Sequence, residues 1–295
     1  MYKNAHAGML NVAYLDAGDP AGRPIVLLHG FPYDIHCYDD VVPRLVAEGA
    51  RVLVPFLRGY GATRFVSPDT LRSGEQAVLG YDLLKFLDAL QIQSAVLAGF
   101  DWGGRAACVV AALWPERVRG LVSCNGYNIQ NIAQSGEPLA PEAERRYWYQ
   151  YYFHSRRGYA GLEKNRRALC RLLWQLWSPG WAFDDAAYER SAASFDNPDF
   201  VDVVIHSYRH RFGLAPGEPA VAEYEARLAA QPQIIVPTIT LEGERDGVNP
   251  PAGAKAHAPR FAGRHEYRLL PGVGHNPPQE APAEFAAAVL AAHTL

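Results

Sequence analysis

The chain has 295 residues, of which 49% are hydrophobic and 20% are charged, and its formal net charge is −3. This composition excludes a disordered or low-complexity protein and allows a sizeable buried core. The balanced charge provides no global attraction to nucleic acid or to an anionic membrane, so we expect neither as a partner. Aromatic residues make up 12% of the chain, and they are unevenly distributed.

Signals for targeting, disulfides and metal binding are missing from the sequence. Residues 1–10 contain no apolar run of the signal-peptide type, and no stretch approaches the roughly 18 apolar residues of a membrane helix. The ten histidines form no HExxH or HxH pattern, and the cysteines lie far apart, at Cys37, Cys108, Cys124 and Cys170. We expect reduced thiols, a cytoplasmic location, no metal and no cofactor.

Short apolar runs and amphipathic segments alternate in the first part of the chain. Residues 74–90 place apolar side chains at spacings of three, and residues 105–114 form an Ala/Val-rich segment closed by Pro115, so both predict helices. Buried strands are predicted at residues 25–28, 51–55, 95–99 and 118–123. This alternation predicts an α/β fold, with a parallel sheet covered on both faces.

The alternation stops after Gly126. Residues 127–230 lack apolar strand runs, are helical in composition and contain 18 of the 34 aromatic residues. Strand character returns at residues 234–241 and 267–270, and an Ala-rich helix is predicted at residues 282–293. We therefore predict a core of residues 1–126 and 231–295, interrupted by a helical domain at residues 127–230.

The run GFDWGG at residues 99–104 follows a predicted strand and opens a predicted helix. It matches the G-x-nucleophile-x-G turn, with Asp101 where a serine often sits. Glycines flank the nucleophile because the turn is tight and a Cβ would collide with neighbouring backbone. We expect Asp101 at the C-terminal edge of the sheet, where open α/β sheets bind ligands.

Two further loops supply groups that a nucleophilic carboxylate requires. The HGFP loop at residues 29–32 follows a strand and would contribute the N–H of Phe31 to an oxyanion hole, paired with the N–H of Trp102. The GVGH loop places His275 after the last strand, and the ERDG loop at residues 244–247 offers an acid after the preceding strand. The order aspartate, acid, histidine predicts a catalytic set.

These motifs, together with RGYG at residues 58–61, resemble the α/β-hydrolase family over nearly the whole chain. The aspartate nucleophile narrows the resemblance to the branch of epoxide hydrolases and haloalkane dehalogenases. The resemblance implies a mostly parallel sheet with helices on both faces and a helical cap inserted after the sixth strand. It matches the triad acid to Asp246, although Glu244 in the same loop could substitute.

The predicted cap contains two segments that resemble those of epoxide hydrolases. In YQYYF at residues 149–153, the resemblance assigns the ring-opening acid to Tyr149, although Tyr147, Tyr151 and Tyr152 lie close by. In SYR at residues 207–209, it assigns a second tyrosine acid to Tyr208. Substrate-binding side chains are predicted in the first segment at Gln150, Tyr152 and Phe153.

The resemblance thus implies an epoxide hydrolase that converts a small apolar epoxide and water into a vicinal diol. Asp101 would form an ester, and a water activated by His275 would hydrolyse it. One alternative is a haloalkane dehalogenase, although Phe31 cannot donate a side-chain hydrogen bond to a halide. Another is a non-catalytic ligand receptor on the same fold. We expect a monomer or a homodimer.

Overall fold

The computed structural model describes residues 2–251 and 255–292. Within these residues, nine strands form one sheet with the order β1-β2-β4-β3-β6-β7-β8-β9, and β5 pairs with β2. The strands β1 and β2 are antiparallel to their neighbours, whereas β4, β3 and β6 to β9 run parallel. The bounds are β1 (Lys3–Ala7), β2 (Leu10–Ala17), β3 (Arg23–Leu28), β4 (Ala50–Pro55), β5 (Arg64–Phe65), β6 (Ala95–Gly99), β7 (Val118–Cys124), β8 (Thr238–Gly243) and β9 (His265–Leu270).

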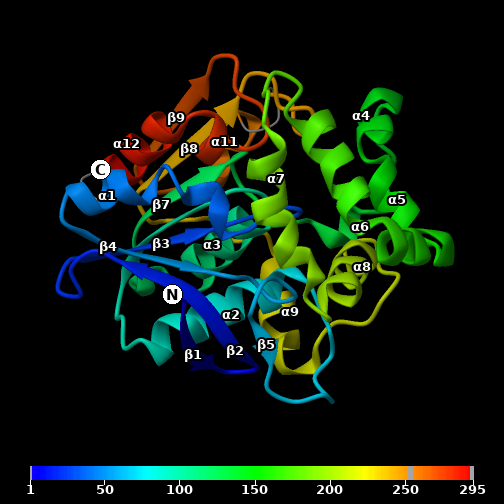
Figure 1. Ribbon diagram of the computed structural model, residues 1–295, viewed down its shortest axis with the longest axis horizontal. Helices are drawn as coiled ribbons and strands as arrows, with labels where there is room; N and C mark the ends of the chain where they lie inside the picture. Colours follow the sequence, from blue (N-terminus) through cyan, green and yellow to red (C-terminus); the bar gives the residue numbers. More distant parts are fainter. Residues whose placement is uncertain (1, 252–254, 293–295) are drawn as a thin grey trace.

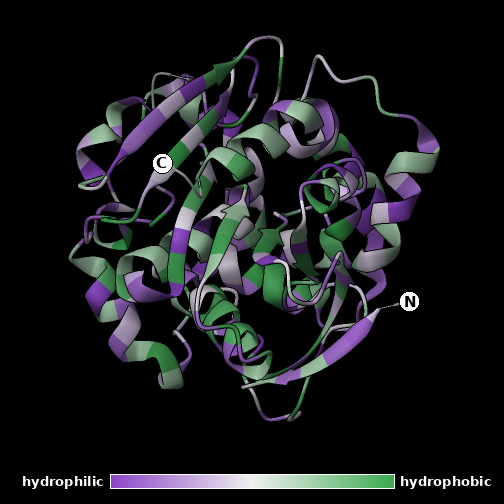
Figure 2. Cartoon of the chain, turned by 90° about the vertical axis from the view of Figure 1, so that its left-hand side faces the viewer, coloured by the Kyte–Doolittle hydropathy of each residue, from purple (hydrophilic) through white to green (hydrophobic). Residues whose placement is uncertain are grey.

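Helices cover both faces of the sheet (Figure 1). On one face α2 packs against α3, and on the other α1 contacts α12. The inner strands β3, β4, β6, β7 and β8 are almost entirely buried, as a parallel sheet between two helical layers requires. Hydrophobic colour accordingly concentrates in the strands that cross the middle of the molecule (Figure 2). The bounds are α1 (Val42–Ala47), α2 (Gln76–Ala89), α3 (Asp101–Leu113), α11 (Pro277–Glu280) and α12 (Pro282–Ala292).

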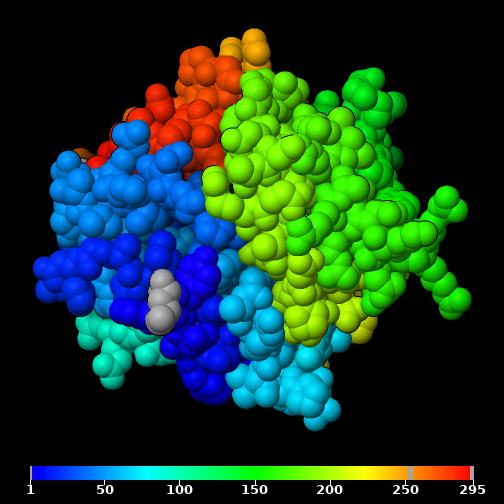
Figure 3. All heavy atoms as spheres, in the orientation of Figure 1, coloured from blue at the N-terminus to red at the C-terminus, as the bar shows by residue number. Residues whose placement is uncertain are grey.

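Between β7 and β8 the chain forms helices and no strand. The insertion thus follows the seventh strand of the structure and not the sixth, and the two-residue strand β5, which pairs with β2, lies among the strands before it. These inserted helices form a block, green to yellow in Figure 3, that lies against one side of the core. They are α4 (Pro141–Arg146), α5 (Trp148–His154), α6 (Arg156–Trp177), α7 (Asp185–Ala192), α8 (Phe200–His210) and α9 (Ala222–Ala229).

The α/β class and the order of its elements are confirmed, but several element boundaries differ from the sequence prediction. Ile234 forms only an isolated bridge with Phe261, and β8 begins at Thr238 because Pro237 has no N–H for the ladder. Helix α3 begins at Asp101 itself. The predicted end of the last helix, His293, lies outside the described residues. The sequence analysis predicts none of the strands β1, β2 and β5. Most residues of β1 are exposed, and β5 has only two residues.

One buried ion pair fixes the RGYG turn after β4 against helix α2. The guanidinium of Arg58 donates from Nε and Nη2 to both carboxylate oxygens of Asp82, at 2.6 and 2.8 Å, and from Nη1 to the carbonyl of Ser73. The Arg58 side chain is fully buried. The bidentate geometry satisfies a charge that would otherwise be stranded in the core.

We predict that Asp82→Ala lowers the free energy of unfolding by about 3–5 kcal/mol, because it leaves the Arg58 guanidinium buried without its counter-charge. Asp88→Ala on the same helix is the matched control. It removes surface ion pairs with Lys85 and Arg117 and should cost less than about 1 kcal/mol. Urea denaturation followed by tryptophan fluorescence measures both. Equal losses of unfolding free energy in the two variants would show that the buried ion pair stabilises the fold no more than a surface pair does.

Candidate active site

Asp101 sits in a strained turn between β6 and α3. Its φ is +50°, a region that residues with a side chain rarely adopt. Close packing enforces this turn, because a Cβ on Gly103 would lie 2.0 Å from the carbonyl oxygen of Leu28. A Cβ on Gly30 would lie 2.5 Å from the Cβ of Asp101. The strain therefore holds the Asp101 carboxylate at the C-terminal edge of the sheet, as the sequence predicts.

The HGFP loop brings a backbone donor to this carboxylate. The N–H of Phe31 donates to Asp101 Oδ1 at 2.8 Å. The loop is braced by His29, whose Nε2 accepts from the N–H of Leu57 at 3.1 Å and whose Nδ1 faces the carbonyl of Gly30 at 3.0 Å. Burial lowers the pKa of His29 to about 4, so its ring is neutral and can serve as both acceptor and donor.

Asp246 and His275 meet at the same edge. His275 Nδ1 lies 2.8 Å from Asp246 Oδ2, and both side chains are fully buried. The remaining acceptor sites of Asp246 are also used, since Asn125 Nδ2 donates to Oδ2 while the N–H groups of Val248 and Asn249 donate to Oδ1. The acid of this pair is therefore held rigidly by groups from two loops.

Glu244, the other acid of the ERDG loop, lies elsewhere. Its side chain accepts from the N–H of Gly272 at the surface. Of the two acids in this loop, Asp246 is the one that contacts His275.

His275 lies between two carboxylates. Its Nε2 is 3.9 Å from Asp101 Oδ2, which is an ion-pair distance longer than a hydrogen bond. Burial alone would lower the pKa of His275, but Asp246 and Asp101 outweigh it and raise the pKa to about 10. Burial likewise acts to raise the pKa of Asp101, but His275, Arg105 and the Phe31 N–H together hold it below its usual range.

The inserted helices hold the backbone of the histidine loop. The N–H of His275 donates to Ser178 Oγ at 3.0 Å, and the N–H of Gly247 donates to the carbonyl of Trp177 at 2.9 Å. Ser178 in turn donates to Glu280 at 2.6 Å. Sequence reasoning missed these positions, along with Asn125, because they carry no motif and matter only through tertiary contacts.

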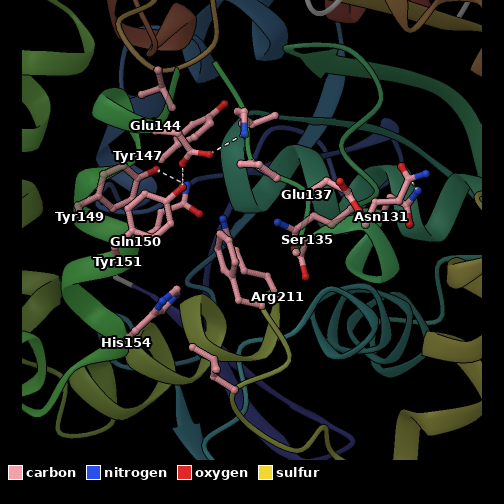
Figure 4. A pocket seen from close by; sticks show the side chains of 18 of the residues that line it. Asn131, Ser135, Glu137, Glu144, Tyr147, Tyr149, Gln150, Tyr151, His154 and Arg211 are labelled. Atoms are coloured by element: carbon pink, nitrogen blue, oxygen red, sulfur yellow. Dashed lines mark hydrogen bonds between the residues drawn. The ribbon is translucent and has the colours of Figure 1, made fainter. Parts of the chain in front are cut away.

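A cavity of about 650 Å³ opens above Asp101 between the core and the inserted helices. Figure 4 shows Tyr149, Gln150 and Tyr151 on one side of it and the loop with Asn131, Ser135 and Glu137 on the other. Arg211 lies between these two walls. The cavity thus has an aromatic wall and a polar wall.

The two tyrosines that the resemblance assigns as acids lie side by side. The rings of Tyr149 and Tyr208 meet edge to face at 5.4 Å, and both are buried. Tyr149 lines the cavity with Asp101, and Gln150 Nε2 donates to its hydroxyl at 3.1 Å. Tyr208 packs on the rings of Phe31 and Trp102 behind it. Burial and the nearby Asp101 charge raise the pKa of both phenols, so both are protonated donors at neutral pH.

The other aromatics in the YQYYF segment, and Tyr147 just before it, have different surroundings. Tyr147 lines the cavity and donates to Asn249 Oδ1 at 3.2 Å, and Tyr151 sits at the exposed rim bonded to Glu144. Phe153 is fully buried against Phe31 and Tyr208 and forms part of the aromatic layer beneath the lining. Tyr152 lies outside the cavity lining and packs against Gly161 of α6. Its ring packs on that of Phe153 at a centroid distance of 6.0 Å, so it contacts one of the other predicted substrate-binding residues from outside the cavity lining.

Three general features of the described residues complete the site. No group of three or more His, Cys, Asp or Glu side chains there could hold a metal ion. All four cysteines are buried free thiols. Among residues 2–251 and 255–292, every helix is too short or too polar to span a bilayer.

The raised pKa of His275 predicts a pH-dependent stability. Its pKa rises from 6.5 in the unfolded chain to about 10 in the fold, so its contribution is complete below pH 6.5 and is lost as pH rises through 10. The difference in unfolding free energy between wild type and His275→Gln should therefore shrink from pH 6 to pH 10. Urea denaturation of both proteins across this range measures the difference, and a constant difference would contradict the raised pKa.

Comparison with known proteins places this geometry in a family. Residues 23–282 match the family described as alpha/beta hydrolase fold. The crystal structure of a candidate epoxide hydrolase from Klebsiella pneumoniae superimposes with a TM-score of 0.98 at 48% identity, covering 100% of this chain and 97% of that one. Epoxide hydrolase A from Mycobacterium tuberculosis is 26% identical over 307 residues, which cover 94% of this chain and 92% of that protein.

Other relatives include an enzyme named for a different reaction and proteins that are much longer than this chain. A haloalkane dehalogenase from Mycobacterium marinum is 28% identical over 275 residues, which cover 88% of this chain and 82% of that protein. By contrast, the chain spans only 19% of the length of the mammalian proteins named bifunctional epoxide hydrolase 2. The sheet order, the Asp101 turn and these matches agree. The chain belongs to the alpha/beta hydrolase fold family, in the branch that contains epoxide hydrolases and haloalkane dehalogenases.

Proposed function

We propose that the protein is an epoxide hydrolase that works through a covalent ester of Asp101. The observation that carries the proposal is a protonated, buried Tyr149 in the same cavity as an ionised Asp101, with Tyr208 beside it. A carboxylate suits attack on an sp³ carbon, and a phenol suits protonation of the oxygen that leaves. The names of the full-length relatives support the same reaction.

In the first step Asp101 Oδ2 attacks one epoxide carbon while the bond from that carbon to the ring oxygen breaks. Oδ2 is free for this attack because Oδ1 is engaged by the Phe31 N–H. The ring oxygen takes a proton from Tyr149 or Tyr208 and becomes a hydroxyl. The product is a hydroxyalkyl ester of Asp101. The tyrosinate that remains takes up the proton that His275 loses once the charge of Asp101 has gone, which restores the phenol and leaves His275 neutral.

In the second step His275 removes a proton from water, and the hydroxide attacks Cγ of the ester. The N–H groups of Phe31 and Trp102 would hold the oxyanion that forms. Removing one donor from such an oxyanion hole typically raises the activation barrier by about 2.7–4 kcal/mol. The ester C–O bond then breaks on the acyl side. The departing alkoxide takes a proton from His275 and leaves as the diol. The proton that remains on the Asp101 carboxyl then passes to His275, which regenerates the Asp101 carboxylate and the protonated His275 of the free protein.

The electrostatics of the site support this order of steps. In the free protein, Asp246 and Asp101 raise the pKa of His275, so its ring holds a proton and is not yet a base. Formation of the ester neutralises Asp101 and removes one of these two charges. The pKa of His275 then falls, and the ring becomes able to accept a proton from water at the moment when the ester needs hydrolysis.

The alternative reaction, release of halide from a haloalkane, has one observation in its favour. The indole Nε1 of Trp102 is buried and has no hydrogen-bond partner among the described residues, so it could face a halide. A second side-chain donor is missing from the HGFP loop, where Phe31 presents only a ring. Epoxide opening, for which Tyr149 and Tyr208 provide acids, remains the better-supported reaction.

The inserted helices would act in this scheme as a cap domain at residues 127–230. They provide both tyrosines and close the cavity over the core, while Trp177 and Ser178 hold the histidine loop. We also propose that the protein is cytoplasmic and is a monomer or a homodimer.

We predict that His275→Gln accumulates the ester. With this residue unable to activate water, incubation with styrene oxide should add the full mass of the epoxide to the intact protein, and peptide mapping should place the adduct on Asp101. The double variant Asp101→Asn/His275→Gln is the control and should gain no mass. An adduct that persists in the double variant would place the nucleophile elsewhere.

We also predict that the double variant Tyr149→Phe/Tyr208→Phe loses epoxide opening, because both phenolic donors are removed while the aromatic packing is kept. Tyr147→Phe is the matched control in the same segment and should retain most diol formation. Single-turnover measurements with styrene oxide follow the ester directly. If the double variant still opens the epoxide, the tyrosines are not the acids, and halide release from haloalkanes becomes the reaction to assay.

A further inference from the structure

The cavity above Asp101 contains an arginine whose charge is not matched by an ion pair. Arg105 lies on α3 one turn after Asp101, and its residue exposure is only 8%. Its Nε donates to the carbonyl of Asn128 at 3.3 Å, but its Nη1 is buried without any hydrogen-bond partner. A buried guanidinium with an unused donor is costly unless a ligand completes it.

A second arginine faces the same cavity from the inserted helices. Arg211 ends α8, and its guanidinium lies 4.2 Å from the ring centroid of Tyr208. Its Nη2 makes a long contact of 3.4 Å with Ser207 Oγ, and its Nε is buried without a partner. Arg211 lines the cavity, and in Figure 4 it appears between the YQYYF segment and the Ser135 loop.

The charge of Asp101 acts on Arg105 from one helical turn away, but no acidic group around the cavity forms an ion pair with either arginine among the described residues. Glu144 is engaged by the N–H of Leu139 and by Tyr151, and Glu137 lies exposed on the loop at the rim. Burial and the neighbouring Arg211 charge together lower the pKa of Arg105 to about 10, as expected for two cations that share a space.

We propose that Arg105 and Arg211 form a subsite for a carboxylate of the substrate, so that the enzyme acts on epoxides whose carbon skeleton carries a carboxylate. This inference rests on the proposed epoxide hydrolysis and specifies its substrate class. It revises the wholly apolar substrate that the sequence predicts. The aromatic wall contacts the apolar part of the substrate, and the two guanidinium groups bind its carboxylate. A singly charged carboxylate fits better than a doubly charged phosphate, because Glu137 and Glu144 also line the cavity.

The test compares two epoxides that differ only in this group. Trans-3-phenylglycidate carries a carboxylate where trans-1-phenylpropylene oxide carries a methyl group. The wild-type kcat/KM should favour the glycidate at least about tenfold. Arg211→Gln should reduce the ratio of the two kcat/KM values by about 10- to 100-fold, the loss expected for a charge-assisted hydrogen bond. Arg157→Gln removes an exposed charge of α6 and should leave the ratio unchanged.

A binding measurement separates this subsite from the chemistry. Trans-cinnamate and cinnamamide lack the epoxide, and calorimetry should show that wild type prefers cinnamate and that Arg211→Gln loses this preference. Circular dichroism checks that the variant is folded, and Arg211→Lys should restore part of the preference. Equal wild-type binding of the two ligands, or a ratio that is unchanged in Arg211→Gln, would overturn the carboxylate subsite. Selective cinnamate binding without any diol formation would uphold the subsite and contradict the proposed reaction.

Discussion

The strained turn at Asp101 is the constraint on which the rest of the site depends. A residue with a side chain is held at a φ of +50° because the backbone of α3 packs directly on the end of β3. This packing lifts the carboxylate out of the sheet edge, where the Phe31 N–H fixes one of its oxygens and leaves the other free. Packing of the buried parallel sheet beneath the turn offsets the free energy of this strained backbone conformation.

Once the carboxylate is fixed, charge organises the neighbouring groups. Five ionisable side chains lie close together at this edge of the sheet, namely Asp101, Asp246, His275, Arg105 and Arg211. The carboxylates keep His275 protonated, and the Arg105 charge helps to keep Asp101 ionised. Neutralising Asp101 therefore lowers the pKa of His275, and neutralising His275 raises the pKa of Asp101. This coupling lets a single event, formation of an ester on Asp101, turn His275 from an acid into a base.

The core of the site could be predicted from the sequence because it lies at strand ends. Asp101, Asp246 and His275 each follow a parallel strand, and the carboxyl ends of parallel strands meet at one edge, so three short motifs were enough to bring them together. The ERDG motif alone does not say which of its two acids contacts His275. In the structure Asp246 does, whereas Glu244 accepts from the N–H of Gly272.

The inserted helices are a different case. Helical periodicity locates them but does not say which face meets the core. It therefore does not reveal that Tyr152 packs outside the cavity lining or that Arg211 faces the cavity. Likewise, the supporting roles of Asn125 and Ser178 arise only from tertiary contacts. The sequence therefore predicts the nucleophile and its partners better than the walls that select the substrate.

The central claim is that Asp101 becomes covalently esterified and that water attacks this ester. A single turnover of wild-type protein in excess over styrene oxide, in water enriched in oxygen-18, tests it most directly. The account predicts that the label enters the carboxylate of Asp101, seen by mass spectrometry of its peptide, and that the diol carries no label. Label in the diol of the first turnover, with an unlabelled Asp101, would contradict it, because water would then have opened the epoxide directly.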